Sequence, residues 1–135
     1  MRLICSPSHP LAAQKRVSWA QLQTQRWVMP PPWATSRTKL HQLFYKNRLN
    51  PPTDCLESAS YLATLAFVQT QNAVGFVARN VAQHLHAQGL VQVLPVALPM
   101  ELPPIGLMLL AGQSPSVATL KLLACLREVA QGWEK

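Results

Sequence analysis

The stretch RWVMPPPWATSRTKLHQLFYKNRLNPPTDCLES, residues 26–58, decides the fold. It begins with the apolar run 26–29, which predicts a short strand buried on both faces. Apolar side chains then recur every three or four positions, which predicts an amphipathic helix over 36–49. Asn50 and the two prolines after it end that helix, and a second short strand is expected at 54–58. Strand, helix and strand joined by short turns are typical of a parallel βαβ unit.

Three prolines, Pro30–Pro32, separate the first strand from the helix. One interpretation is a proline-rich docking motif, which has to be extended and exposed. The other is a rigid turn, because proline fixes φ and disfavours helix at the residue before it. We favour the turn, since a buried strand and an amphipathic helix flank the prolines. The prolines then delay the helix until Thr35 and Ser36, either of which is a suitable N-cap.

The same alternation continues along the chain. Further strands are expected at 2–6, 73–77 and 90–96. Further helices are expected at 18–23 with Ser18 as N-cap, from Ser58 to Thr70, and at 78–88 with Gly89 at the C-cap. The expected apolar face of the helix after Ser58 consists of Ala59, Leu62, Leu65 and Ala66. This order of elements favours an α/β fold with a mainly parallel sheet.

The last third of the chain has a different character. A proline-rich crossing at 98–104 leads into a long apolar strand at 105–112. Ser114 and Pro115 then begin a final helix that extends to Gly132. Because this strand and helix lead away from the βα core, we expect them to belong to a second subdomain, together with the opening strand.

The composition indicates one folded domain with an unusual surface. Of 135 residues 49% are hydrophobic and only 13% are charged, against roughly 25% charged residues in an average globular protein. So little charge indicates an apolar face that meets a partner, or a part of the natural protein outside this chain. The net charge is +7, with the basic residues concentrated before Asp54. They are scattered without interleaved aromatic residues, so direct nucleic-acid binding by this segment is not favoured.

Cysteine usage and hydropathy bear on the compartment. Cys5, Cys55 and Cys125 are few, odd in number and far apart, which fits a reducing compartment better than a disulfide framework. The sequence has no signal peptide and no apolar run near the roughly 20 residues of a membrane span. These features predict a soluble, cytoplasmic protein with no membrane contact.

A search for chemistry yields little. The sequence has no G-x-S-x-G, G-x-G-x-x-G or P-loop motif. Asp54 and Glu57 are close together, but a paired-carboxylate site is not expected in a chain with so few acids. His84 and His86 diverge in the helix expected there, and no cysteine or acid lies close to them. We therefore expect no enzyme activity, no catalytic residues, no metal and no cofactor.

Two helix starts are the remaining candidates for a binding site. Thr35-Ser36 and Glu57-Ser58 each follow a predicted strand directly. Strand-to-helix turns gather at the carboxyl edge of an open α/β sheet, where free N–H groups and the helix dipole favour an anionic or polar group. The other interpretation is that both serines simply cap helices, which is commoner for either one taken singly. Their position at one edge of one sheet is what favours a ligand cleft.

Several segments follow one another in a familiar order: HPLA (9–12), VSWAQL (17–22), RWVMPPP (26–32), TSRTKLHQLF (35–44), ESASYLATLAFVQTQNAVGFVARNVAQHL (57–85) and GLVQVLPVALPMELPPIGLML (89–109). This succession resembles the effector-binding (substrate-binding) region of LysR-type bacterial transcriptional regulators. The resemblance covers nearly the whole chain. No single motif is diagnostic, and the order and spacing of the segments together make the match specific.

The resemblance implies a periplasmic-binding-protein-like (type 2) fold with two α/β subdomains joined by crossing strands. On this comparison residues 1–11 resemble a crossing strand and loop, and 12–97 the complete second subdomain. Residues 98–135 resemble the return crossing with the last strand and helix of the first subdomain. The family's DNA-binding helix-turn-helix does not precede Met1, so we expect an N-terminally truncated regulator.

The resemblance also implies a site. In LysR-type regulators a small-molecule effector binds in the cleft between the subdomains. Carried over to this sequence, the second-subdomain wall consists of Pro32, Trp33, Ala34, Thr35 and Ser36, with Ser58, Thr70 and Asn72 near the same crevice. Trp33 stands where similar sequences often have a small residue, so its bulk is expected to narrow the cleft or redirect the effector. Arg37 is either a further anion-holding group or an exposed arginine of the helix surface.

The resulting hypothesis is the ligand-sensing part of a transcription regulator that binds a small, anionic or polar metabolite. The resemblance implies a homo-oligomer at full length, for which helix 36–49 and the edge strand 54–57 are the candidate contacts. It implies DNA binding only through a domain absent from this chain. The alternative is a stand-alone small-molecule or solute-binding protein of the same fold, and an α/β enzyme ranks third.

Overall fold

The structure is a computed structural model that describes residues 1–100 and 106–132. The chain divides into two compact units, Met1–Leu102 and Pro103–Lys135. The first unit contains one sheet with helices on both faces, and the second contains a single described helix. Within the described residues, no helix combines the length and apolarity that a membrane span requires.

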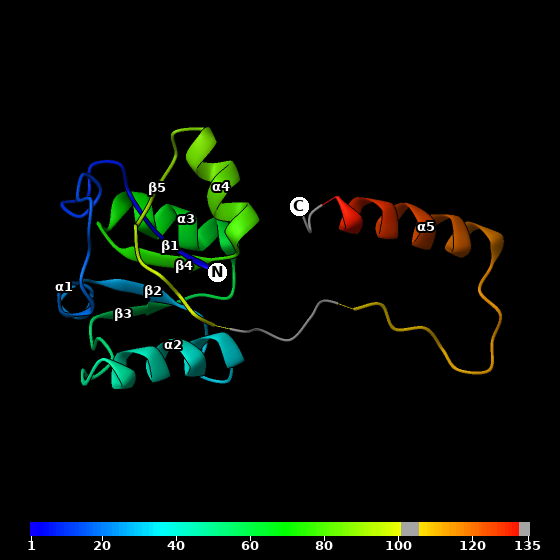
Figure 1. The fold of residues 1–135 in the computed structure, drawn as a ribbon, viewed down its shortest axis with the longest axis horizontal. Helices are drawn as coiled ribbons and strands as arrows, with labels where there is room; N and C mark the ends of the chain where they lie inside the picture. Colours follow the sequence, from blue (N-terminus) through cyan, green and yellow to red (C-terminus); the bar gives the residue numbers. More distant parts are fainter. Residues whose placement is uncertain (101–105, 133–135) are drawn as a thin grey trace. The chain divides into compact units, whose positions relative to one another are not determined.

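The sheet of the first unit has five strands in the order β3-β2-β4-β1-β5 (Figure 1). They are β1 (Arg2–Cys5), β2 (Trp27–Met29), β3 (Cys55–Glu57), β4 (Val74–Val77) and β5 (Gln92–Val93). Strand β2 pairs in parallel with both β3 and β4, while β1 pairs antiparallel with β4 and with β5. The predicted parallel βαβ units are therefore confirmed for β2, β3 and β4. The strand predicted over 90–96 is reduced to two residues.

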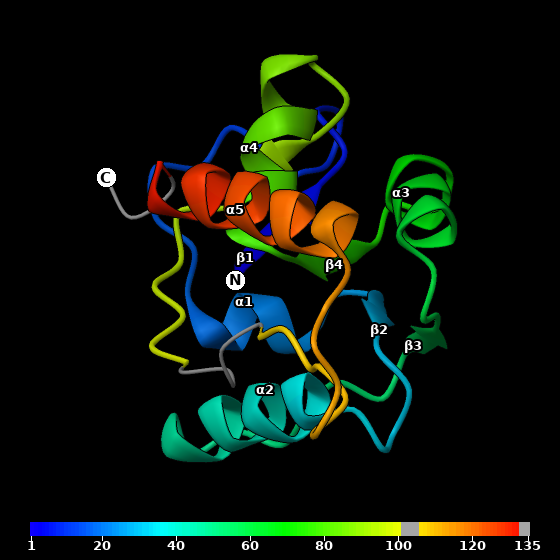
Figure 2. The ribbon, with the colours of Figure 1, turned by 90° about the vertical axis from the view of Figure 1, so that its right-hand side faces the viewer.

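Helices cover both faces of this sheet. In Figures 1 and 2, α2 (Thr35–Lys46) lies on one side, and α3 (Tyr61–Thr70) and α4 (Arg79–Ala87) lie on the other. Side chains alternate accordingly: Trp27 and Met29 of β2 belong to the cluster that contains the buried residues of α2, and Val28 belongs to the cluster on the α3 and α4 side. Burial of all three β2 residues confirms the prediction of a strand enclosed on both faces.

Aromatic side chains organise the core on the α2 face. Phe44 of α2 packs edge-on against Trp27, at a ring-centroid distance of 5.7 Å, and against Trp19, at 5.0 Å. The buried Trp27 indole donates its Nε1–H to the carbonyl of Leu22 at 2.8 Å. Leu22 is the buried residue of α1 (Trp19–Gln23), whose predicted cap is confirmed because Ser18 and Gln21 form a capping box. Strand β2 thereby holds α1 and α2 together.

Three other predicted N-caps are wrong. Helix α2 begins after Ala34, whose own N–H donates to the Pro31 carbonyl at 3.0 Å and closes the proline turn. Helix α3 begins after Ser60 rather than Ser58, because the Ser58 hydroxyl accepts the Ser60 N–H at 3.1 Å and forms a local turn. In the second unit α5 (Val117–Gln131) begins after Ser116, which accepts the Thr119 N–H, rather than at Ser114-Pro115.

Two helices end in the same left-handed motif. In α4 the C-cap is Gln88, and Gly89, which was predicted at the C-cap, is the next residue, with φ 71°. In α2 that position is Arg48, at φ 59°, with N–H bonds from Arg48 to Tyr45 and from Leu49 to Phe44. The helix therefore ends at Lys46, several residues before the prolines that were expected to end it.

The buried face of α3 also differs from the prediction. Thr64 and Val68 are buried, whereas Leu62 is 81% exposed and Ala59 and Ala66 are also exposed. The reason lies in β4, where Gly75 offers no side chain. A Cβ at Gly75 would lie 2.7 Å from Cγ2 of Val68, so α3 packs closely at this one position and presents its 64–68 face to the sheet.

In the second unit the predicted strand at 105–112 is not observed. The described part, 106–112, carries no strand pairing, and Leu107, Met108, Leu109 and Leu110 are exposed. A strand is stable only when its N–H and C=O groups bond a partner, and the sequence pattern alone supplies none. Helix α5 ends at Gln131 with Gly132 as its C-cap, which agrees with the predicted extent of the helix. The predicted crossing at 98–104 lies partly outside the described residues.

The close packing at Gly75 gives a stability prediction. Gly75→Ala is expected to lower the free energy of unfolding by about 1–3 kcal/mol, because the new methyl overlaps Val68 and crowds Ile4 at 3.2 Å. Urea denaturation followed by circular dichroism measures this change. Gly106→Ala is the matched control, since no described atom lies within 4 Å of its added Cβ. Equal unfolding free energies for both variants would contradict the close approach of α3.

Candidate functional site

A pocket lies where β2 and β3 end. The two strands are parallel and in register from Trp27–Cys55 to Met29–Glu57, so their carboxyl ends lie at one edge of the sheet. The chain leaves β2 through the proline turn into α2, and it leaves β3 through 58–60 into α3. These turns and the sheet enclose about 300 Å³, which we call the β2–β3 pocket.

The β2–β3 pocket has one wall of hydroxyl groups and another of apolar side chains. Its hydroxyl groups come from α2, α3 and the turn before α3, namely Ser36, Ser58, Ser60, Tyr61 and Thr64. Its larger apolar side chains come from the residue before β1, from β2 and β4, and from the proline turn, namely Met1, Val28, Pro30, Pro31, Trp33 and Phe76. No charged side chain is among the described residues that line it. The pocket therefore suits a small molecule with one polar end and one apolar body.

Backbone N–H groups of α2 add to the polar side. The N-cap Ala34 has no side chain that can accept a hydrogen bond, and no acidic residue occupies the first turn. Within the described chain, the N–H groups of Thr35 and Ser36 have no hydrogen-bond partner. The first turn of α3 also lacks an acid, although Ser60 caps it by accepting the Ala63 N–H at 3.4 Å. Two positive helix ends thus border the pocket without a protein anion.

Arg37 closes the base of the proline turn. Its Nη1 forms an ion pair with Glu57 at the end of β3 and donates to the Pro30 carbonyl at 3.2 Å. The side chain is mostly buried, so it is not the exposed helix-surface arginine that was one of the two expectations. Its charge is paired locally with Glu57, and its guanidinium fixes the turn after β2 against β3.

The structure brings together four of the eight predicted site residues. Trp33, Ala34, Ser36 and Ser58 line the β2–β3 pocket. Pro32 and Thr35 belong to the same turn and helix start but do not line the pocket, and both are exposed.

Thr70 and Asn72 lie elsewhere. They stand between α3 and β4, so they precede the amino end of a strand that is parallel to β2. The pocket lies at the carboxyl ends, and the expectation that this turn shares the crevice placed it at the wrong edge of the sheet.

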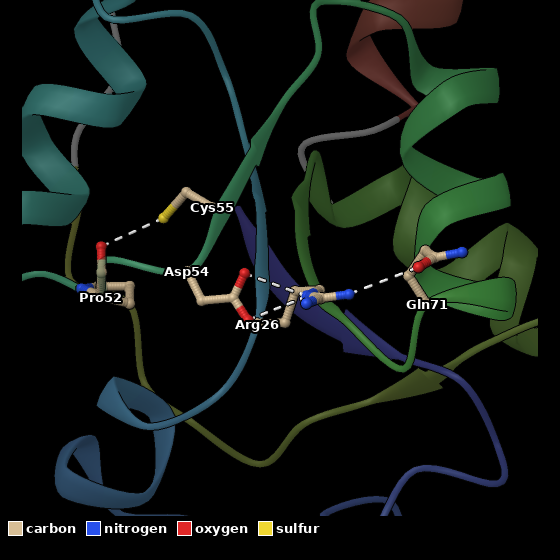
Figure 3. Close-up of polar contacts among 5 residues, drawn as sticks. All are labelled: Arg26, Pro52, Asp54, Cys55 and Gln71. Carbon is tan, nitrogen blue, oxygen red and sulfur yellow. Dashed lines mark hydrogen bonds and ion pairs between the residues drawn. The ribbon is translucent and has the colours of Figure 1, made fainter.

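Polar contacts join the residues of that opposite edge (Figure 3). Arg26 directly precedes β2, and its Nε donates to both carboxylate oxygens of Asp54, before β3, at 3.1 and 3.0 Å. Its Nη1 contacts Oε1 of Gln71, near the start of β4, at 3.5 Å. The Cys55 thiol donates to the Pro52 carbonyl at 3.2 Å. The amino ends of β2, β3 and β4 are thus linked by side chains, whereas the carboxyl ends of β2 and β3 border a pocket.

Sequence reasoning missed part of the pocket. Ser60, Tyr61 and Thr64 were not singled out, because the cap of α3 was expected at Ser58. The local turn made by Ser58 could have been suspected from the Ser-x-Ser pattern, which offers two competing caps. Phe76 comes from β4 and was not recognisable as a lining residue without the strand order. Among residues 1–100 and 106–132, no three potential ligands of the His, Cys, Asp or Glu type gather at a metal site.

The strand order and the helices on both faces define a mixed α/β domain with a pocket at the carboxyl edge of its parallel strands. The family model of the LysR substrate binding domain matches residues 1–131. The chain belongs to this family, which confirms the resemblance and the periplasmic-binding-protein-like fold class. The family is one of transcriptional regulators.

The relatives agree with this assignment. The transcriptional regulator GbpR of Azospirillum brasilense is 29% identical over 125 residues, covering 92% of this chain and 36% of the relative. The regulator GalR of Pseudomonas putida is 29% identical over 129 residues, covering 96% of this chain and 32% of the relative. The chain therefore spans about a third of the length of these curated relatives.

Solved structures show the same fold. The CcmR regulatory domain of Synechocystis PCC6803, in complex with 2-PG, has a TM-score of 0.66 at 18% identity, covering 95% of this chain and 61% of that domain. The BenM effector binding domain, with its effector benzoate, has a TM-score of 0.55 at 19% identity, covering 73% of this chain and 45% of that domain. At 18–19% sequence identity these structures show a shared fold and nothing about the ligand of this chain.

Two histidines each have a buried ring nitrogen without a hydrogen-bond partner among the described residues. His9 is 3% exposed; its Nδ1 accepts the Leu11 N–H at 3.1 Å, and its Nε2 has no partner among the described residues. Burial lowers the pKa of His9, and the nearby Asn72 backbone partly opposes this shift. Burial and the charge of Arg37 also lower the pKa of His41, whose Nε2 is buried without a described partner. Both imidazoles are therefore neutral in the folded protein near neutral pH.

The protein is expected to lose stability as the pH falls. Because the pKa of His9 is lower in the folded state than its ordinary 6.5, the unfolded state binds the proton first as pH falls below 6.5. Each such histidine gives a slope of at most about 1.4 kcal/mol per pH unit. His9→Asn keeps an acceptor for Leu11 and is expected to reduce the slope measured by urea denaturation between pH 7 and pH 5. His84→Asn, on the exposed side of α4, is the control, and equal slopes in both variants would exclude His9 as a source.

Proposed function

We propose that this domain is the effector-sensing portion of a LysR-type transcription regulator and that the β2–β3 pocket is its part of the effector site. The effector is a small metabolite whose anionic or strongly polar end meets the starts of α2 and α3. DNA binding through a separate helix-turn-helix domain, homo-oligomer formation and a cytoplasmic location complete the proposal. The candidate contacts for pairing are α2 and β3, which is an edge strand of the sheet.

The observation that carries the proposal is the pair of helix starts at one pocket. Each start has a partial positive charge, and neither first turn has an acidic side chain to balance it. A carboxylate at this position can accept hydrogen bonds from the free N–H groups of Thr35 and Ser36 and from the hydroxyls of Ser36 and Ser58. No negatively charged side chain lines the pocket, so nothing there repels such an anion.

The comparisons support the proposal without identifying the ligand. The CcmR regulatory domain is in complex with 2-PG, and BenM binds benzoate, which is a small carboxylate. The alternative, a stand-alone solute-binding protein of the same architecture, is less favoured because the curated relatives are transcriptional regulators. An α/β enzyme is less favoured for the same reason.

Ser36 gives the direct test. Benzoate and inorganic phosphate, titrated separately, are expected to shift the backbone amide resonances of Ser36 and Tyr61 with dissociation constants of about 1 mM or weaker. Ser36→Ala is expected to weaken benzoate binding about 10-fold, because it removes a hydroxyl donor to a charged group. Ala34 is the N-cap, so this substitution removes no helix cap.

Thr35→Val is the matched control. Thr35 stands at the same helix start, but its side chain is exposed and does not line the pocket. Its substitution is expected to change the affinity less than twofold while leaving the backbone N–H in place. If neither anion shifts the pocket amides at tens of millimolar, or if Thr35→Val weakens binding as much as Ser36→Ala, the assigned site is wrong.

A further inference from the structure

We propose that Trp33 makes the β2–β3 pocket selective for acids that carry a flat aromatic ring. This inference rests on the proposed function, because it names the class of effector for the same site. Trp33 lines the pocket and is 84% exposed, and Tyr61, on the rim at the start of α3, is 59% exposed. Two aromatic side chains therefore present free surface at one pocket.

The exposure of Trp33 distinguishes it from the other tryptophans of the described chain. Trp27 is fully buried against Phe44 with its N–H bonded to Leu22, and Trp19 packs on the other side of Phe44. Trp33 has no ring partner and no hydrogen bond in the described residues. A tryptophan buries roughly 150–250 Å² when it is packed, so this side chain keeps most of its contact area available to a ligand.

The backbone holds Trp33 in place. It follows Pro30–Pro32, whose φ angles are fixed by their rings, and the Ala34 N–H bond to the Pro31 carbonyl closes the turn around it. Arg37 ties the Pro30 carbonyl to Glu57 of β3. The turn is thus fixed at both ends before any ligand binds, so stacking on the indole costs little backbone entropy.

The volume and the polarity of the β2–β3 pocket suit a ligand with one ring and one acid group. A cavity of about 150 Å³ is enough to hold benzene, so the 300 Å³ pocket has room for a six-membered ring and its carboxylate. With the carboxylate at Ser36 and Ser58, the body of the molecule lies along the apolar wall of Val28, Pro30 and Phe76. Trp33 is on that apolar wall, where a flat ring gains more contact than a saturated one.

The test compares two acids that differ only in the ring. Benzoate and cyclohexanecarboxylate have the same charge and similar size, and their affinities are measured from the Ser36 amide shift. The protein is expected to bind benzoate about 3- to 10-fold more tightly, the range of an aromatic contact. Trp33→Ala is expected to remove that preference, and Trp33→Phe to retain part of it. The exposure of Trp33 means that neither substitution disturbs the core.

Tyr45→Ala is the matched control, since Tyr45 is an exposed aromatic residue of α2 that does not line the pocket. If both acids bind equally and Trp33→Ala weakens neither, the selectivity is overturned while the effector site stands. If neither acid shifts the pocket amides, the proposed function fails and the selectivity with it. If Trp33→Ala instead dissociates an oligomer and leaves the benzoate preference unchanged, Trp33 serves an interface and the inference is overturned.

Discussion

Strand β2 is the element on which the rest of the first unit depends. It is only three residues long, yet every residue is buried, and it pairs with β3 on one side and β4 on the other. Trp27 connects it to α1 and α2, while Val28 faces the cluster on the α3 and α4 side. Full burial of such side chains contributes about 1.5–3 kcal/mol each, and here it is combined with an interior position in the sheet, between β3 and β4. The chain then enters the prolines at once, so the same short strand positions the pocket.

The two edges of the parallel strands have different roles. At the amino edge, Arg26 and Asp54 are exposed, and an exposed ion pair contributes only about 0–1 kcal/mol. The register there comes from the backbone, through the bonds of Trp27 N–H to Asp54 and of Val74 N–H to Arg26 at 2.9 and 2.8 Å. At the carboxyl edge one side-chain link, from Arg37 to Glu57 and to the Pro30 carbonyl, fixes the turn after β2 against β3. That edge is left with two helix starts and a pocket between them.

The order of strands and helices was predictable because buried strands and amphipathic helices leave regular apolar patterns. The details that failed depend on contacts that no pattern contains. The start of α3 depends on the turn that Ser58 forms with Ser60, and its buried face depends on Gly75 in a strand beneath it. The strand expected at 105–112 required a partner strand. The site was half predictable: strand-to-helix turns gather at the carboxyl edge, whereas the turn at Thr70 and Asn72 leads into a strand and belongs to the amino edge.

Two departures from local folding rules lie side by side at the β2–β3 pocket. Ala34 is a poor N-cap, which costs about 0.5–2 kcal/mol relative to Ser or Asp, and it leaves N–H groups of α2 unbonded. Trp33, beside it, is exposed although its indole would gain stability from burial. By contrast, Ser18, Ser60 and Ser116 cap their helices, and Trp27 is buried with its N–H bonded. Helix α4 also begins after an alanine, Ala78, without a side-chain cap, so Ala34 is a departure only in combination with the exposed Trp33 beside it. Natural proteins often break one or two local rules at functional sites. A molecule that accepts hydrogen bonds from the free N–H groups of α2 and covers Trp33 would compensate for both. This is the physical argument for placing the effector at this pocket.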